Sequence, residues 1–212
     1  MQWLWIIWTG LFLAAYFIGG IPTAYLAARW IKGADIRQLG NRNAGAANVY
    51  RTVGHKAGIA VAVVDIVKGA VAVVLAKAIL DSTTAEMISG GLAVAGHNWP
   101  VHLQLRGGRG ASTAVGVLLA TIPMLAIPLG LASLAILYFT KKVTVSLGFF
   151  LFLAPILAWW PMNYSYPLAV YSLLMPLLVG MSHYLSVKRL AYSNNGGNNG
   201  GDNGGELPLC HH

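Results

Sequence analysis

The sequence has little charge and almost no cysteine. Only 9% of its 212 residues are charged, against about a quarter in an average soluble domain. By contrast, 57% are hydrophobic, and the mean hydropathy is +0.63. A chain of this composition cannot bury its apolar surface in one water-soluble core, so we predict that lipid surrounds it. The single cysteine, Cys210, excludes an intramolecular disulfide.

Several motifs of known chemistry are also missing. The sequence contains no H-E-x-x-H motif, cysteine-rich metal set or Ser-His-Asp arrangement, so we predict neither a metal nor a cofactor. No repeat of about 20 to 50 residues is evident, and segments 115–139 and 147–158 are apolar, which weighs against a small transporter. The net charge is +8, but the basic residues lie in short loops. We therefore predict no nucleic-acid partner, and no obligate protein partner either.

Long apolar runs occupy 3–28, 57–80, 111–139, 143–162 and 166–187. They predict an all-α integral membrane protein with about seven transmembrane helices, provided that the run 111–139 breaks into two near Pro123. This polytopic region is expected to cover residues 1–192. The Asn/Gly-rich segment 193–212 is expected to be a disordered tail, because its composition cannot offset the entropy of ordering the backbone.

The distribution of basic residues predicts the orientation. Six Lys and Arg residues fall between Arg29 and Lys56, with Asp35 as the only acidic residue among them, so this loop should be cytoplasmic. With one span before that loop, the N-terminus lies outside. Asp81 and Glu86 then mark an external link. The last span ends in the cytoplasm, and so does the C-terminus.

The first of three polar segments on the predicted cytoplasmic side is LGNRNAGAANVYRTVG, residues 39–54. Gly45 allows a ligand to approach the backbone closely, Asn43 and Asn48 offer donors and acceptors, and Arg51 can bind a phosphate with two parallel hydrogen bonds. A tight loop with asparagine caps and basic anchors would have the same composition, and this segment alone does not decide between the two.

The second segment, GHNWPVHLQLRGGRG, covers residues 96–110 and leads into an apolar run at Ala111. A glycine loop at a helix N-terminus offers exposed N–H groups and the positive end of the helix dipole, and Arg106 and Arg109 add charge. The segment is not a Walker A loop, because the GK[ST] ending is absent. We predict an anion site, with a turn carrying positive-inside anchors as the alternative.

The third segment, GMSHYLSVKRL, covers residues 180–190 where the last span emerges. His183 and Ser186 are three residues apart and share a helix face, so both can reach one ligand, although a lone histidine at a helix end is more often interfacial. In the second span, Asp65 and Lys68 are also three apart, and we expect them to form a structural pair. Together the three segments predict a site for a phosphorylated small molecule.

These segments resemble, in order, the motifs of the bacterial acyl-phosphate:glycerol-3-phosphate acyltransferases, the PlsY family. The resemblance spans roughly residues 10–190 and rests on IPTAYL (21–26), DIRQLG, NAGAANVYRTVG, DIVKG (65–69), GHNWPVHLQLRGGRG and the histidine before KRL. It implies a multi-pass enzyme of the bacterial cytoplasmic (inner) membrane, with its active site facing the cytoplasm. Its substrates would be acyl phosphate and glycerol 3-phosphate, and its products lysophosphatidic acid and phosphate.

The resemblance also implies residue roles. First-motif Asn and Arg residues and the third-motif His would hold glycerol 3-phosphate, and second-motif glycines would bind acyl phosphate. The candidate catalytic residues are Asn41, Arg51, Arg109, His183 and Ser186. The candidate substrate-binding residues are Asn43, Gly45, Asn48, Gly107, Gly108 and Gly110.

Four positions depart from the family pattern. Asn41 replaces a serine, Ala47 a threonine, Arg109 a lysine and Ser186 an asparagine. Arg109 keeps the charge in a planar fork, whereas Ala47 keeps no hydrogen-bonding group. The alternative function is therefore a catalytically weak relative that binds a phosphorylated metabolite or lipid without turnover.

Overall fold

The computed structural model describes residues 2–160 and 164–198, and within these ranges every regular element is a helix. Nine α-helices and two short 3₁₀ helices, η1 and η2, follow one another in this described part of the chain. Their bounds are α1 Gln2–Gly19, α2 Thr23–Lys32, η1 Ile36–Gln38, α3 Ala46–Thr52, α4 His55–Leu80, α5 Thr83–Asn98, η2 Val101–Leu103, α6 Ala111–Thr121, α7 Pro123–Thr140, α8 Val143–Trp159 and α9 Tyr166–Asn198.

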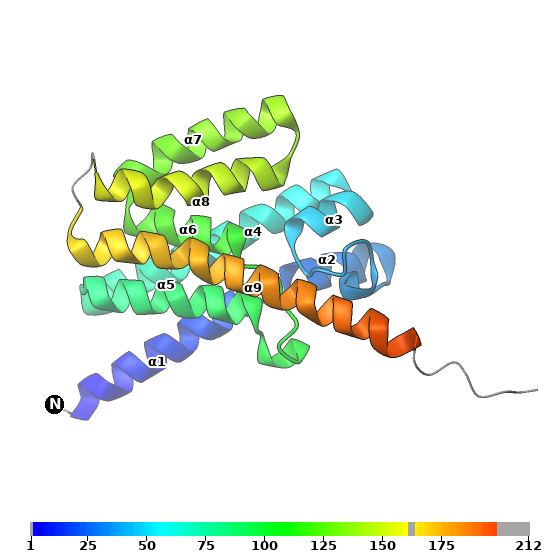
Figure 1. Ribbon diagram of the computed structural model, residues 1–212. Helices are drawn as coiled ribbons and strands as arrows, with labels where there is room; N and C mark the ends of the chain where they lie inside the picture. The colour runs from blue at the N-terminus through cyan, green and yellow to red at the C-terminus, as the bar shows by residue number, and fades with distance from the viewer. Residues whose placement is uncertain (1, 161–163, 199–212) are drawn as a thin grey trace, which may run out of the picture.

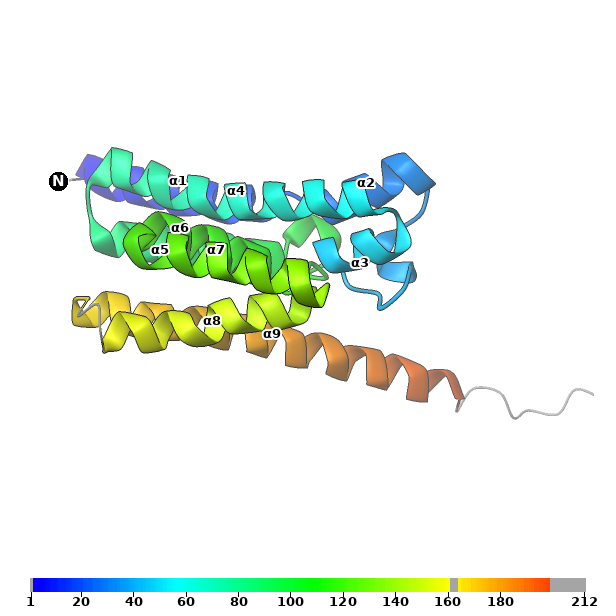
Figure 2. The ribbon, with the colours of Figure 1, turned by 90° about the horizontal axis from the view of Figure 1, so that it is seen from above.

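The longer helices run side by side in three layers. Helices α1 and α4 form one outer layer, α5, α6 and α7 lie in the middle, and α8 and α9 form the other outer layer (Figure 2). The short helices α2 and α3 gather at one end of the bundle, and the C-terminal half of α9 extends past the same end (Figure 1). Polar loops that are far apart in the sequence therefore meet at that end.

Proline and left-handed residues set the helix boundaries. Pro22 lies between α1 and α2, and Gly33 ends α2 with φ +67°, donating its N–H to the Arg29 carbonyl. Helix α6 ends at Thr121 and α7 begins at Pro123, so the predicted break in the long apolar run is confirmed. Helix α9 continues to Asn198, which places the predicted tail boundary at residue 193 inside a helix. The rest of that predicted tail, with Cys210, lies outside the described residues.

Four described helical segments are long and apolar enough to cross a membrane: Trp3–Lys32, His55–Leu80, Pro123–Thr140 and Tyr166–Arg189. Two further apolar helices, Ala111–Thr121 and Val143–Trp159, are shorter. Large apolar side chains lie on the outside of the bundle, for example Trp3, Val74 and Phe152, each more than half exposed. Such a surface is suited to lipid. The number of seven spans and the side on which each end lies stay predictions.

Small residues let the helices of the middle layer approach their neighbours. A Cβ atom added to Gly116 on α6 would overlap the backbone carbonyl of Ile66 on α4, and one added to Gly96 on α5 would overlap the carbonyl of Tyr16 on α1. Close backbone contact of this kind is the usual way in which helices associate in lipid. Gly90, Ala93 and Gly96 on α5 are all buried, as small residues at helix contacts should be.

We expect Gly116→Ala to lower the stability of the bundle. The added methyl group meets backbone rather than a flexible side chain, and overpacking of this kind costs about 1–3 kcal/mol. Gly91→Ala is the matched control, because it is also inside a helix but has no neighbouring atom within 4 Å of an added Cβ. It should gain up to about 1 kcal/mol from helix propensity. Thermal unfolding in detergent measures both changes, and equal shifts would show that the α4–α6 contact is not tight.

Candidate functional site

Three segments that are distant in the sequence come together at one end of the bundle. They are the loop from α2 to α3, the loop from α5 to α6, and the C-terminal half of α9. Arg37 of the first loop donates to the Leu103 carbonyl of the second at 3.1 Å. Ser182 and Arg189 of α9 donate to the carbonyls of Gly108 at 3.4 Å and Leu105 at 3.1 Å. The predicted meeting of the three polar segments is thus present in the fold.

The buried side chain of Asn48 organises the first loop. Its Nδ2 group lies within 3.2 Å of the carbonyls of Ile36, Leu39 and Asn43, and its Oδ1 atom accepts the Asn41 backbone N–H at 3.3 Å. Its hydrogen-bonding groups are therefore used within the protein. In the structure the Asn48 side chain stabilises the loop. Its contact with substrate stays a prediction.

Asn41, Asn43 and Gly45 form the turn that leads into α3. The Oδ1 atom of Asn41 accepts the backbone N–H of Asn43 at 3.2 Å, and the Asn41 side chain is exposed. Gly45 is buried, and a Cβ atom there would lie 2.7 Å from Asn43 Nδ2. A side chain at position 45 would therefore push Asn43 aside. Glycine is needed at position 45 because the Asn43 side chain lies against it.

The glycine loop is closed onto the end of α5. Gly107 and Gly108 donate their N–H groups to the carbonyls of Asn98 and His97, both at 3.1 Å. Tertiary contacts with α5 therefore use both of these N–H groups. The donors that remain for an anion include those of the first turn of α6, which begins after Gly110 with φ +76°. The roles of Gly107, Gly108 and Gly110 as substrate-binding residues stay predictions.

Close packing explains why glycine occupies positions 108 and 110. A Cβ atom on Gly108 would overlap the His97 ring and approach the Ala44 carbonyl, and one on Gly110 would meet Oδ1 of Asn98. The Asn98 side chain is only 3% exposed, and neither its Nδ2 nor its Oδ1 has a hydrogen-bond partner among the described residues. Unsatisfied buried amides are rare in folded proteins. The Asn98 amide lies against Gly110 of the glycine loop.

Positive charge is concentrated around Arg109. Its guanidinium is half-buried, and its Nε atom has no partner within the described ranges. Burial lowers the pKa of Arg109, and so does the nearby positive charge of Arg51. Arg109 also lies within electrostatic range of His183. Arg51 itself is exposed and donates from Nε to the Ala47 carbonyl at 3.1 Å.

No carboxylate neutralises this cluster in the part of the chain that the structure describes. The ion pairs found there join Asp35 to Arg37, and Asp65 to Lys68 and His97. Two neighbouring arginines repel each other unless an anion lies between or beside them. The cluster of Arg51, Arg109 and His183 is therefore suited to a phosphate group, which two guanidinium forks can bind.

Helix α9 contributes His183 to this cluster. His183 is exposed, and Ser186 donates its hydroxyl to the Ser182 carbonyl at 2.8 Å. Ser182 is buried and reaches the glycine loop through the Gly108 carbonyl. Sequence reasoning missed Ser182, although its position four residues before Ser186 places both on one helix face.

A buried charge network lies under the glycine loop. Asp65 is 1% exposed and accepts from Lys68 Nζ at 2.7 Å and from Thr23 Oγ1 at 2.6 Å, and His97 Nδ1 lies 3.6 Å away. Lys68 also donates to the Ile21 carbonyl at 3.1 Å. The predicted Asp65–Lys68 pair is confirmed. Thr23 and His97 come from distant helices, so only the fold reveals them as partners. The described residues include no cluster of His, Cys, Asp and Glu suited to a metal ion.

Comparison with known proteins identifies the family. The family model described as glycerol-3-phosphate acyltransferase matches residues 9–193. Glycerol-3-phosphate acyltransferase 1 of Dehalococcoides mccartyi is 38% identical over 183 residues, which cover 84% of this chain and 88% of the relative. The glycerol-3-phosphate acyltransferase of a Thermoanaerobacter species is 36% identical over 180 residues, which cover 84% of this chain and 89% of the relative.

Solved structures show the same architecture. The glycerol 3-phosphate form of PlsY, an integral membrane glycerol 3-phosphate acyltransferase, superposes with a TM-score of 0.75 at 28% identity, over 88% of this chain and 92% of that one. Its lysophosphatidic acid form gives a TM-score of 0.73 over the same shares. The apolar helices and this likeness identify a multi-pass membrane protein. The chain belongs to the glycerol-3-phosphate acyltransferase family.

Proposed function

We propose that this protein transfers a fatty acyl group from acyl phosphate to the 1-hydroxyl of glycerol 3-phosphate, forming lysophosphatidic acid and inorganic phosphate for phospholipid synthesis. The observation that carries the proposal is positive charge without a counter-ion: Arg109 lies within electrostatic range of both Arg51 and His183, and no carboxylate pairs with them among the described residues. Both substrates bring phosphate groups, and each such group can neutralise part of this charge. Family membership supplies the acyl-transfer chemistry.

The reaction needs little chemical help from the protein, because acyl phosphate is already activated. The 1-hydroxyl oxygen attacks the acyl carbon, the new ester C–O bond forms, and the bond from the acyl carbon to the phosphate oxygen breaks. The hydroxyl proton leaves with phosphate or through a neighbouring base. Positioning the two substrates and neutralising the charge on the leaving phosphate supply the rate without a covalent enzyme intermediate.

The candidate residues divide between the two substrates. In this proposal Arg51, Asn43 and His183 hold glycerol 3-phosphate, with Asn41 and Ser186 as further hydrogen-bonding groups. Arg109 and the first turn of α6 hold the phosphate of the acyl donor, and Gly107, Gly108 and Gly110 give that loop its shape. The first-turn N–H groups and the helix dipole favour an anion at this place.

The second candidate function is binding without turnover. It is favoured by Ala47, where the resemblance expects a threonine: the side chain carries no polar group, and the Ala47 carbonyl is occupied by Arg51. Purified protein in detergent or lipid, given palmitoyl phosphate and glycerol 3-phosphate, separates the two functions. Formation of lysophosphatidic acid together with phosphate supports the transferase. Intact protein that binds palmitoyl phosphate but makes no product supports the binding role.

We also propose that the site faces the cytoplasm in the bacterial inner membrane, within a seven-span topology that has its N-terminus outside. The basic loop Arg29–Lys56 and the lysines at 141 and 142 support this orientation. In a Cys210→Ser background, a membrane-impermeant thiol reagent applied to whole spheroplasts should label Glu86→Cys and spare Lys142→Cys. After the membrane is opened, both should react. The reverse pattern would invert the topology and move the site to the outer face.

A further inference from the structure

The turn between η2 and the glycine loop has an unusual backbone. Gln104 and Leu105 are consecutive residues with side chains, yet both lie in the left-handed region, at φ 56° and 58°. Left-handed backbone brings Cβ close to the carbonyl oxygen, so two such residues in succession are disfavoured. The turn is closed by the Leu105 N–H on the Pro100 carbonyl at 3.0 Å and the Arg106 N–H on the Leu103 carbonyl at 3.2 Å. Strained turns persist where their surroundings hold them.

Two arginines from the other site segments hold this turn by its carbonyl groups. Arg37, in the loop from α2 to α3, donates from Nη1 to the Leu103 carbonyl. Arg189, on α9, donates from Nη1 to the Leu105 carbonyl. Both distances are 3.1 Å. The turn is therefore held by contacts from outside its own segment, one from each of the other two segments of the candidate site.

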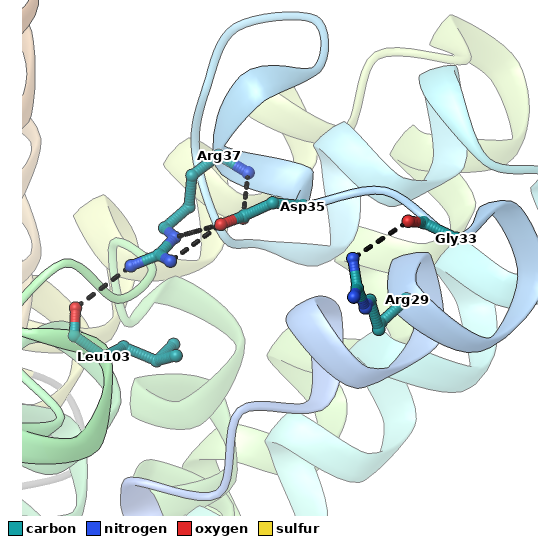
Figure 3. Close-up of polar contacts among 5 residues, drawn as sticks. All are labelled: Arg29, Gly33, Asp35, Arg37 and Leu103. Atoms are coloured by element: carbon teal, nitrogen blue, oxygen red, sulfur yellow. Dashed lines mark hydrogen bonds and ion pairs between the residues drawn. The ribbon is translucent and has the colours of Figure 1, made fainter.

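Bonds to Asp35 hold the Arg37 guanidinium in the orientation that reaches Leu103. Asp35 accepts Nε at 3.0 and 3.1 Å and Nη2 at 2.7 Å, and it also accepts the Arg37 backbone N–H at 2.9 Å. The guanidinium lies 5.6 Å from the centre of the Tyr25 ring. Nη1 is left to point across to Leu103, as Figure 3 shows. A planar fork can make both sets of bonds at once, whereas a lysine ammonium has no such geometry.

Arg29 is a natural comparison on the same surface. It donates from Nη1 to the Gly33 carbonyl at 3.0 Å, a contact within the C-terminal cap of its own helix (Figure 3). Arg29 and Arg37 thus each donate to one backbone carbonyl. Only the contact of Arg37 joins two loops, so the two arginines form a matched pair for experiment.

The held turn lies just before Arg109 in the sequence. Arg106 follows the left-handed pair directly, Gly107 and Gly108 are then anchored to α5, and the half-buried Arg109 comes next. We propose that Arg37 is a positioning residue for the donor side of the site: from the loop that carries Arg51, it fixes the turn that places Arg109 against the phosphate of the acyl donor. The donor's identity rests on the proposed function.

The first test measures the turn itself. Hydrogen–deuterium exchange of the amides of Arg106, Gly107 and Gly108 should become faster in Arg37→Ala and stay unchanged in Arg29→Ala. Arg37→Lys keeps the charge without the fork, so its exchange should lie between that of Arg37→Ala and wild type. Size-exclusion profiles identify the folded fraction, and Arg37→Lys serves if Arg37→Ala does not fold. Unchanged exchange in Arg37→Ala and Arg37→Lys would overturn the proposal.

The second test measures the donor site without relying on turnover. The dissociation constant of palmitoyl phosphate, from thermal-shift titration in detergent, should rise by about tenfold in Arg37→Ala, since a misplaced binding group loses most of its contribution. Arg29→Ala should match wild type. If Arg37→Ala speeds amide exchange in the turn but leaves the affinity for palmitoyl phosphate unchanged, Arg37 only stabilises the turn, and its positioning role is overturned. If wild type binds palmitoyl phosphate with this pattern yet makes no lysophosphatidic acid, the proposed function fails and the positioning role stands.

Discussion

Arg51→Ala is expected to raise the KM for glycerol 3-phosphate, and Arg109→Ala the KM for acyl phosphate, with kcat/KM falling by more than about tenfold in each. A hydrogen bond to a charged group contributes about 1.5–3 kcal/mol, and about 1.4 kcal/mol corresponds to a factor of ten. Steady-state kinetics in which each substrate is varied at a saturating level of the other would give both constants. His183→Ala should also lose more than about tenfold, since it removes a polar group beside Arg109.

Lys142→Ala is the control for these variants. It also removes one positive charge near the end of a helix, in the turn between α7 and α8, but lies in none of the three segments that form the site. Its kinetics should match wild type. A double variant tests whether the arginines share one phosphate: strongly non-additive losses in Arg51→Ala/Arg109→Ala would indicate one shared group, and additive losses two separate ones. Normal kinetics in both single variants would exclude the cluster as the phosphate site.

Helix positions and the grouping of polar segments could be predicted from local features. Long apolar runs, Pro123 and the charge of the loops were enough to indicate helices, the break before α7 and the three polar segments at one end. Asp65 and Lys68 were predictable as a pair because spacing alone brings residues i and i+3 together on a helix. Each of these features depends on a few neighbouring residues.

Contacts between distant segments could not be predicted in this way. The glycine loop looked like a set of exposed N–H groups, but the carbonyls of His97 and Asn98 accept two of them, and this closure depends on how α5 ends. Arg37 looked like one more basic anchor, and nothing local indicates that it reaches Leu103. Nothing local indicates that the Asn48 amide donates to three loop carbonyls, because these surround it only after folding. Tertiary structure decides which polar groups stay available.

The buried network under the site should make Asp65→Leu strongly destabilising. The substitution leaves the buried Lys68 ammonium with the Ile21 carbonyl, at 3.1 Å, as its one remaining hydrogen-bond partner among the described residues. Removing one member of a buried ion pair typically costs about 3–5 kcal/mol. Unfolding by denaturing detergent, followed by circular dichroism, measures the change. Lys77→Met is the control, since Lys77 is an exposed lysine on the same helix, and its loss should have little effect.

Lys68→Met should cost less than Asp65→Leu, because His97 and Thr23 still face the Asp65 carboxylate and a protonated His97 can supply the missing positive charge. The double variant Asp65→Leu/Lys68→Met removes both charges and should recover most of the stability that Asp65→Leu loses, since well-packed apolar residues often replace a buried pair at little cost. If the double variant is as unstable as Asp65→Leu, the hydrogen bond from Thr23 and the contact with His97 carry the stability, and the pairing with Lys68 does not.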